Sequence, residues 1–206
     1  MACAGRRAVP EIPSNEEIVE LLKQLEEKTA DDLESEALEF VSWDKDMKKN
    51  LEQAVEGVVS FANVQGGVIV FGVEDKVVGR RQAITGCCGY DLDKWRQYIY
   101  ENTRPSLSCA VEQIRVPEGT LILVRVGPSP TERCGTVGGL FKIRVGKSNM
   151  PLDPSMLRRE QGPALSPDES ILPRVAAQHG GNIYLMEIDH TDPFVRVPDA
   201  EDMYDI

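Results

Sequence analysis

Residues 60 to 75 read Ser60-Phe-Ala-Asn63, then Val-Gln, then Gly66-Gly67, and finally Val68-Ile-Val-Phe-Gly72-Val-Glu-Asp75. The first four residues end a longer run with apolar side chains at helical spacing, and the two glycines supply the turn that follows. The run that begins at Val68 is almost continuously apolar, which is typical of a strand in the middle of a sheet. This stretch predicts a helix packed on a sheet, and a central strand that ends just before Asp75.

The sequence on either side predicts the remaining elements. Ser14 to Glu17 has the spacing of a capping box at the start of a helix. Periodicity and turn residues predict the following elements: strands at 37–41, 107–116, 121–126 and 140–145, helices at 46–63 and 91–103, a short helix at 151–160, and an added edge strand at 182–188. We therefore predict an α+β (mixed α/β) fold, in which one compact domain has a central mixed sheet flanked by helices, with an N-terminal helix and an acidic C-terminal tail.

The charge of the chain is unevenly distributed. Residues 1–33 carry 4 basic and 8 acidic residues, and residues 161–206 carry 2 and 9, so these flanks account for the whole net charge of −11. We divide the chain into an N-terminal extension with a helix (1–33), a neutral domain (34–160) and an acidic linker and tail (161–206). A neutral domain binds a polyanion only if its basic residues gather on one face.

Composition also limits the compartment and the metal chemistry. Five cysteines are an odd number, and no apolar run approaches the roughly 20 residues of a membrane span. We expect an intracellular protein, cytoplasmic or nuclear and not secreted, with free thiols and no membrane partner. Cys87 and Cys88 lack a second pair at zinc spacing, so no zinc is expected.

Three carboxylates accompany the central stretch, namely Glu34, Glu39 and Asp75. Clustered carboxylate oxygens hold hard cations, which can position water against a phosphate, so these residues are candidates for a Mg²⁺ or Mn²⁺ site. The alternative is that they are ordinary surface acids. Along the strand at 37–41, Glu39 is expected to point away from the core side, and Glu34 can meet it only if the chain bends between them, near Ser35-Glu36.

The order of these motifs resembles the AlbA-like domain of Schlafen proteins and of many bacterial proteins. The motifs that carry the resemblance are Glu34 and Glu39-Phe40, Ser60-Phe-Ala-Asn63, Gly66-Gly67, Gly72-Val-Glu-Asp75, Gly86, Pro105, Val124-Arg-Val126 and Arg144-Val-Gly146. The resemblance covers about residues 34 to 160 and implies a compact α/β domain.

The resemblance also implies an activity. Vertebrate Schlafens use three carboxylates for metal-dependent endoribonuclease action on structured RNA such as tRNA, and these fall on Glu34, Glu39 and Asp75. Many bacterial relatives are described only as nucleic-acid-binding, regulator-like or ATP-binding. This chain departs from the pattern at Val41, where the family usually has Lys, and it lacks the His and Cys set of the Schlafen zinc site.

Other basic residues can take the place of the missing Lys, and we name Lys45, Lys48, Lys49, Arg144 and Lys147 as candidate nucleic-acid contacts. The predicted function is that of a Schlafen-like domain that binds nucleic acid, RNA or else DNA, and cleaves RNA with Mg²⁺ or Mn²⁺. The alternative is a non-catalytic module that binds nucleic acid or a partner protein, including a second copy in a homodimer.

A third option is ATP binding. Gly146-Lys-Ser148 has the end of a phosphate-binding loop, but Phe141 stands where the first glycine belongs and Met150-Pro151 follows instead of a helix, so this motif argues against it.

Overall fold

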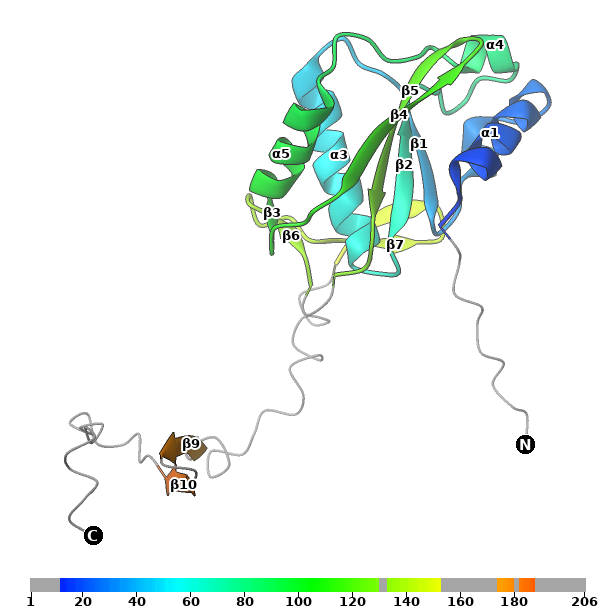
Figure 1. The fold of residues 1–206 in the computed structure, drawn as a ribbon. Helices are drawn as coiled ribbons and strands as arrows, with labels where there is room; N and C mark the ends of the chain where they lie inside the picture. Colours follow the sequence, from blue (N-terminus) through cyan, green and yellow to red (C-terminus); the bar gives the residue numbers. More distant parts are fainter. Residues whose placement is uncertain (1–11, 130–132, 153–173, 180–181, 188–206) are drawn as a thin grey trace, which may run out of the picture. The chain divides into compact units, whose positions relative to one another are not determined.

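A four-stranded sheet with the order β1-β2-β5-β4 forms the centre of the fold (Figure 1). β1 (Leu38–Val41) runs parallel to β2 (Gly67–Phe71), whereas β5 (Gly119–Val126) runs antiparallel to both β2 and β4 (Ala110–Val116). The sheet is therefore mixed, and the α+β prediction is confirmed. The computed structural model describes residues 12–129, 133–152, 174–179 and 182–187.

Helices cover both faces of this sheet (Figure 1). α3 (Met47–Ala62) and α5 (Leu92–Asn102) pack on one face. α1 (Asn15–Lys23) and the 3-10 turn η1 (Gln24–Glu26) pack on the other. Since α1 adds Ile18 and Leu22 to this second core, it belongs to the same unit as the sheet.

The two cores explain the continuous apolar run of β2. Ile69 and Phe71 point into the core beneath α3, and Val68 and Val70 point into the core beneath α1. All four side chains are fully buried. A strand between two cores is apolar at every position because its side chains alternate between faces that are both covered.

The ends of the helices follow the predicted signals. Ser14 and Glu17 form a reciprocal capping box at α1, in which each side chain accepts from the other residue's backbone N–H. Asp46 caps α3 at its start and Asn63 at its end. Gly66 follows with φ 83°, and a Cβ there would lie 2.5 Å from the Val126 carbonyl oxygen, so this turn requires glycine.

Several short elements were not predicted from the sequence. These are α2 (Ala30–Leu33), α4 (Arg80–Ala83), the pair β3 (Thr103–Arg104) and β6 (Gly135–Thr136), and β8 (Ser148–Pro151), the partner of β7 (Lys142–Val145). The helix expected from Pro151 is wrong at its start, because Pro151 belongs to β8. The rest of that expected helix, residues 153–160, lies outside the described residues.

Residues 154–206 form a second unit, distinct from the unit of residues 1–153. Its described part is a hairpin of β9 (Arg174–His179) and β10 (Asn182–Glu187). The strand expected at 182–188 is therefore present, but it pairs with β9 and not with the central sheet. Apart from this hairpin, the predicted acidic linker and tail (161–206) lies outside the described residues. Among the described helices, none is both long enough and apolar enough to cross a membrane.

Candidate functional site

Glu34 lies where α2 ends and the chain turns into β1. A tight turn, closed by an isolated bridge between Ser35 and Leu38, directs the carboxylate back along the strand. There its Oε1 accepts a hydrogen bond from the backbone N–H of Phe40 at 3.0 Å. The chain bends between Glu34 and Glu39, which is the condition that strand parity sets for the two side chains to meet.

Glu39 extends from the face of β1 that α3 covers. A Cβ at Gly57 of α3 would lie 3.2 Å from Glu39 Oε2, and Asn149 Nδ2 of β8 donates to Oε1 at 2.8 Å. Only 18% of the Glu39 side chain is exposed. The expectation that Glu39 points away from the core side is wrong, because the sheet has a core on each face.

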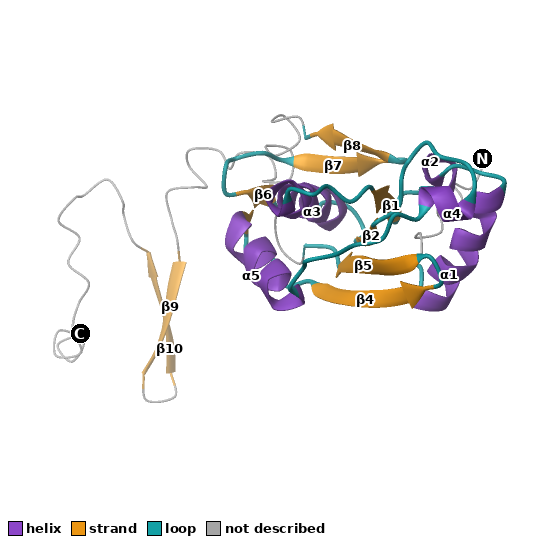
Figure 2. Cartoon of the chain, turned by 90° about the horizontal axis from the view of Figure 1, so that it is seen from above, coloured by secondary structure: helices purple, strands orange, loops and turns teal. Residues whose placement is uncertain are grey.

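Arg144 of β7 joins the two carboxylates. Its Nη2 lies 3.7 Å from Glu34 Oε2 and its Nη1 lies 3.4 Å from Glu39 Oε1. The guanidinium also donates to the carbonyl oxygens of Ser35, at 3.1 and 3.2 Å, and of Leu38, at 2.9 Å. These contacts fix the β7–β8 hairpin beside β1, as seen from above in Figure 2.

The burial of Arg144 corrects one expectation. Its side chain is 1% exposed and packs over the ring of Phe61, with 5.0 Å from the guanidinium carbon to the ring centroid. A phosphate in solvent cannot reach a guanidinium that is buried and already hydrogen-bonded. In this arrangement Arg144 is a counter-charge for Glu34 and Glu39 and not a contact for nucleic acid.

The carboxyl groups respond to this environment. The pKa of Glu34 is raised to about 7, chiefly by burial; the Phe40 N–H and Arg144 oppose this rise, and the charges of Glu39 and Asp75 contribute to it. Burial also raises the pKa of Glu39, and Arg144 opposes that rise. Strongly perturbed carboxyl groups gathered from distant segments are characteristic of functional sites, and also of structural ion-pair networks.

Asp75 lies beyond the C-terminal end of β2 and is more exposed than the two glutamates. Burial raises its pKa, and the charge of Asp31 adds to this effect. The Asp75 carbonyl oxygen accepts from the backbone N–H of Asp31 at 3.1 Å, and the Asp31 carboxylate pairs with the exposed Lys147 of the β7–β8 turn. Asp75 acts on Glu34 and Glu39 only through its charge, since no contact joins their side chains in the described structure.

These residues, as arranged, do not fit a divalent ion. Within the described ranges, no group of three or more His, Cys, Asp or Glu side chains is positioned to hold a metal. The oxygens of Glu34 and Glu39 that would face a shared ion face the guanidinium of Arg144 instead. The expected Mg²⁺ or Mn²⁺ site stays a prediction, and it requires Arg144 to move.

The predicted lysine contacts lie elsewhere. Lys45 precedes α3, and Lys48 and Lys49 lie in its first turn; all three are exposed. None of the interactions found at Glu34 or Glu39 involves them. These three lysines therefore take no part in the interactions of the predicted carboxylates, whereas Arg144 contacts both glutamates.

Other motifs from the sequence have structural roles. Gly146 and Lys147 form the turn between β7 and β8, so no helix follows them as a phosphate-binding loop requires. Burial raises the pKa of the Cys87 thiol to about 12. Trp95 is buried and stacks on Trp43, with ring centroids 6.0 Å apart, so neither is arranged as a free platform for bases.

The sequence analysis missed Asn149 and Asp31, which hold Glu39 and Lys147 respectively. Asn149 follows Arg144-Val-Gly146 at the distance of a two-residue hairpin turn, because Val145 pairs with Ser148 and Arg144 with Asn149. That spacing was a usable signal for a hairpin. Nothing in the local sequence of Asp31 indicates a contact with residues more than a hundred positions away.

A family model described as "Schlafen, AlbA_2" matches residues 34–153, more than half of the chain. This chain belongs to the Schlafen AlbA_2 family. The match includes Glu34, Glu39, Asp75, β7 and β8, and it ends at residue 153, where the first of the two units ends. No curated protein is significantly similar to the chain.

Solved structures share the fold of this Schlafen AlbA_2 domain. The DIP2311 protein of Corynebacterium diphtheriae is 21% identical with a TM-score of 0.50; the match covers 69% of this chain and 26% of that one. The N-terminal domain of a RecG-related protein from Nitrosomonas europaea is 22% identical with a TM-score of 0.40, over 65% and 92% of the two chains. The chain thus spans about a quarter of the DIP2311 protein, and the first likeness shows the fold alone.

Proposed function

We propose that this chain binds RNA at the edge of the domain where β1 ends and α3 begins. The observation that carries the proposal is the group of exposed lysines at the start of α3, namely Lys45, Lys48 and Lys49. The first turn of this helix contains no acidic residue. RNA is chosen over DNA because the Schlafen nucleases that the sequence resembles act on structured RNA.

The position of these lysines is unfavourable for the helix itself. A helix N-terminus carries partial positive charge from the aligned peptide dipoles, so cations there are destabilising and acids are preferred. The same partial charge attracts phosphate. Because the Asp46 side chain caps α3 and accepts from the Lys48 N–H at 3.0 Å, a phosphate at this end is bound chiefly by the lysine side chains in this proposal.

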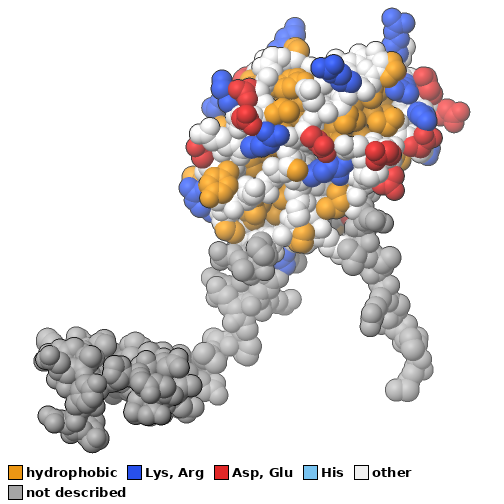
Figure 3. Space-filling view, viewed as in Figure 1, with side chains coloured by type: hydrophobic (Ala, Val, Ile, Leu, Met, Phe, Trp, Pro, Cys, Tyr) orange, Lys and Arg blue, Asp and Glu red, His pale blue; other side chains and the backbone are white. Residues whose placement is uncertain are grey.

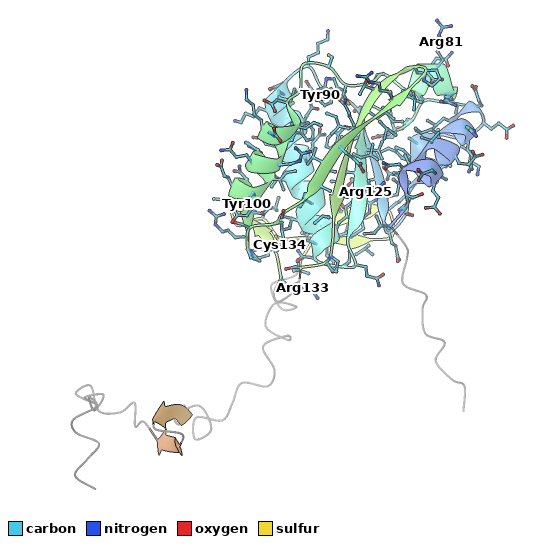
Figure 4. The ribbon with its side chains drawn as sticks, in the orientation of Figure 1. Arg81, Tyr90, Tyr100, Arg125, Arg133 and Cys134 are labelled. Atoms are coloured by element: carbon cyan, nitrogen blue, oxygen red, sulfur yellow. The ribbon has the colours of Figure 1, made fainter. Side chains whose placement is uncertain are left out.

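Neighbouring loops add positive charge at the same end of the sheet. Lys76 follows β2 and Arg81 lies on α4; both are exposed, and Arg81 protrudes at the top of the molecule in Figure 4. Ligands of α/β sheets commonly bind beyond the C-terminal ends of parallel strands, which here are β1 and β2. Lys49 and Lys48 do pair with Asp44 and Glu52, but surface ion pairs contribute at most about 1 kcal/mol and yield to a phosphate.

A binding assay tests the proposal. Fluorescence anisotropy with labelled tRNA would compare the wild type with the triple variant Lys45→Ala, Lys48→Ala, Lys49→Ala. We expect weaker binding and a salt dependence whose slope falls by roughly 0.7 to 0.9 per lost phosphate contact. The matched control is Lys23→Ala, Lys28→Ala, Arg104→Ala, which removes the same charge from exposed positions elsewhere.

The outcomes separate the alternatives. Equal losses in the two triple variants would mean that only net charge matters, and this would contradict the proposed interface. Tighter binding of single-stranded DNA of the same length would reassign the ligand. No salt-sensitive binding to either nucleic acid would leave the protein-binding alternative.

Hydrolysis of the RNA is the second candidate function. The observation in its favour is that Glu39 and Asp75 lie near enough to Glu34 for their charges to raise its pKa. Cleavage of tRNA that needs Mg²⁺ or Mn²⁺, stops with EDTA, and is lost in folded Glu39→Gln and Asp75→Asn variants would establish it. RNA binding without cleavage in all these conditions would leave the binding function alone.

A further inference from the structure

One edge of the central sheet pairs with no other strand of the described residues. β4 is the last strand in the order β1-β2-β5-β4, and Figure 2 shows it at the outer edge of the sheet, with α5 near one end and α1 near the other. β4 has seven residues, from Ala110 to Val116, and alternate ones direct their backbone N–H and C=O groups to that side. Such an edge is a template for another extended strand.

The hairpin between β4 and β5 fixes which backbone groups point outward. Val116 pairs with Gly119 across a two-residue turn, so this pair is hydrogen-bonded, and the pattern alternates along β4 from there. Val111, Gln113 and Arg115 therefore direct their N–H and C=O groups away from β5. The observed hydrogen bond from Arg96 to the Val111 carbonyl agrees with this assignment.

Arg96 occupies only the first of these three positions. In the part of the chain that the structure describes, the backbone groups of Gln113 and Arg115 have no hydrogen-bond partner. Both residues are exposed. The open segment of the edge is thus short and ends at the Pro117 turn, which offers no further N–H.

We propose that β4 pairs antiparallel with β4 of a second copy of this chain, about a two-fold axis at Ile114. In this register Gln113 and Arg115 form hydrogen-bonded pairs with Arg115 and Gln113 of the second copy. Ile114 lies opposite Ile114 of the second copy, and Glu112 lies opposite Val116 of the second copy. The two sheets become one continuous sheet.

The charges on β4 select this register from its neighbours. A two-fold axis at Glu112 places this residue opposite Glu112 of the second copy, and an axis at Arg115 places Arg115 opposite Arg115. Like charges that lie directly opposite are destabilising. A two-fold axis at Gln113 places Val111 opposite Arg115 of the second copy, and this pair needs the outer backbone groups of Val111. The Val111 carbonyl already accepts a hydrogen bond from Arg96. Alignment about Ile114 uses only the free groups of Gln113 and Arg115 and opposes no like charges.

The surface around β4 is suited to a second copy and not to a polyanion. The face in front of the viewer in Figure 3, where β4 lies, mixes hydrophobic side chains with charges of both signs. On either side of β4, Tyr90 donates to the Gln113 side chain at 2.5 Å and Arg125 pairs with Glu112 at 3.0 Å, so the strand is held firmly (Figure 4). This inference is independent of the proposed RNA function.

Two variants at one position test the register. Gln113→Glu places a carboxylate opposite Arg115 of the second copy, and Gln113→Lys places a cation there. Two symmetric pairs should make the dimer roughly 2- to 30-fold tighter in Gln113→Glu and weaker by a similar factor in Gln113→Lys. Sedimentation equilibrium of the full chain over a range of concentrations measures both dissociation constants.

Each outcome is decisive. Opposite effects of the two variants support the axis at Ile114. A weaker dimer in both variants would move the axis to Gln113 and overturn the register. A monomer at all concentrations, or a dimer that neither variant changes, would overturn the interface. Amide hydrogen exchange of the wild type adds a readout, since the Gln113 and Arg115 amides should become protected as the protein concentration rises.

Discussion

The two edge strands of the central sheet differ in whether side chains bind their outward backbone groups. At β1, the outward N–H of Phe40 is bound by Glu34, and the outward carbonyl of Leu38 is bound by Arg144. At β4, the outer backbone groups of Gln113 and Arg115 have no partner among the residues that the structure describes. The difference teaches that Glu34, one of the carboxylates singled out by the sequence as a metal site, covers an edge strand together with Arg144.

The largest effect is expected when the closed edge is broken at Arg144. Arg144→Ala leaves Glu34 and Glu39 partly buried without their counter-charge and frees the β7–β8 hairpin from β1. Removing one partner from a buried ion pair costs about 3–5 kcal/mol. Urea unfolding measures this loss. Arg81→Ala, at an exposed position, is the control and should change stability by less than about 0.5 kcal/mol.

The second effect is a pH dependence that originates at Glu34. Its pKa is about 7 in the folded protein against an ordinary 4.5, so the folded state binds the proton more tightly than the unfolded state. The contribution of this group to stability is therefore full below pH 4.5 and is lost as the pH rises to about 7. Unfolding at pH 5 and pH 7.5 should show this loss in the wild type. Glu34→Gln cannot titrate and should show a smaller difference between the two pH values; an unchanged difference would contradict the assignment.

A third test uses proline to compare neighbouring positions of the open edge. The N–H of Arg115 points outward, so Arg115→Pro removes no hydrogen bond within the sheet, and should cost the monomer about 1 kcal/mol or less while weakening the dimer. The N–H of Ile114 points toward β5, opposite Leu121, so Ile114→Pro removes a bond of the sheet and should destabilise the monomer more. Equal destabilisation by the two variants would show that the outward assignment of β4 is wrong.

The smallest effect is expected from a divalent ion. Because Arg144 faces the oxygens that an ion would need, millimolar MnCl₂ should leave the melting temperature of the wild type unchanged, since only a ligand that binds the folded state stabilises it. A rise in melting temperature that Glu39→Gln abolishes would contradict this expectation. It would support the nuclease as the function of the site.

Much of the fold could be predicted from local signals. The capping box at Ser14, the apolar stripe of α3 and the continuous run of β2 each depend on residues that are neighbours in the sequence. The β7–β8 hairpin was missed because its strands are short, and Met150 and Val145 remain exposed, so no alternation of buried and exposed residues marks it. Strand parity predicted only the condition for Glu34 to meet Glu39, namely a bend between them, since two residues five positions apart cannot share a face of a straight strand.

The sequence by itself determined the family, the order of the main elements and the identity of the carboxylates. Only the tertiary structure decided what those carboxylates contact. Glu39 faces a second core because α3 covers that side of the sheet, and Arg144 reaches Glu34 from a hairpin more than a hundred residues away. Local patterns encode helices, strands and turns, whereas the charge environment of a side chain depends on which distant segments pack against it. For the same reason, strand order makes both β1 and β4 edge strands, and only the contacts of Glu34 and Arg144 with backbone groups of β1 distinguish the two edges.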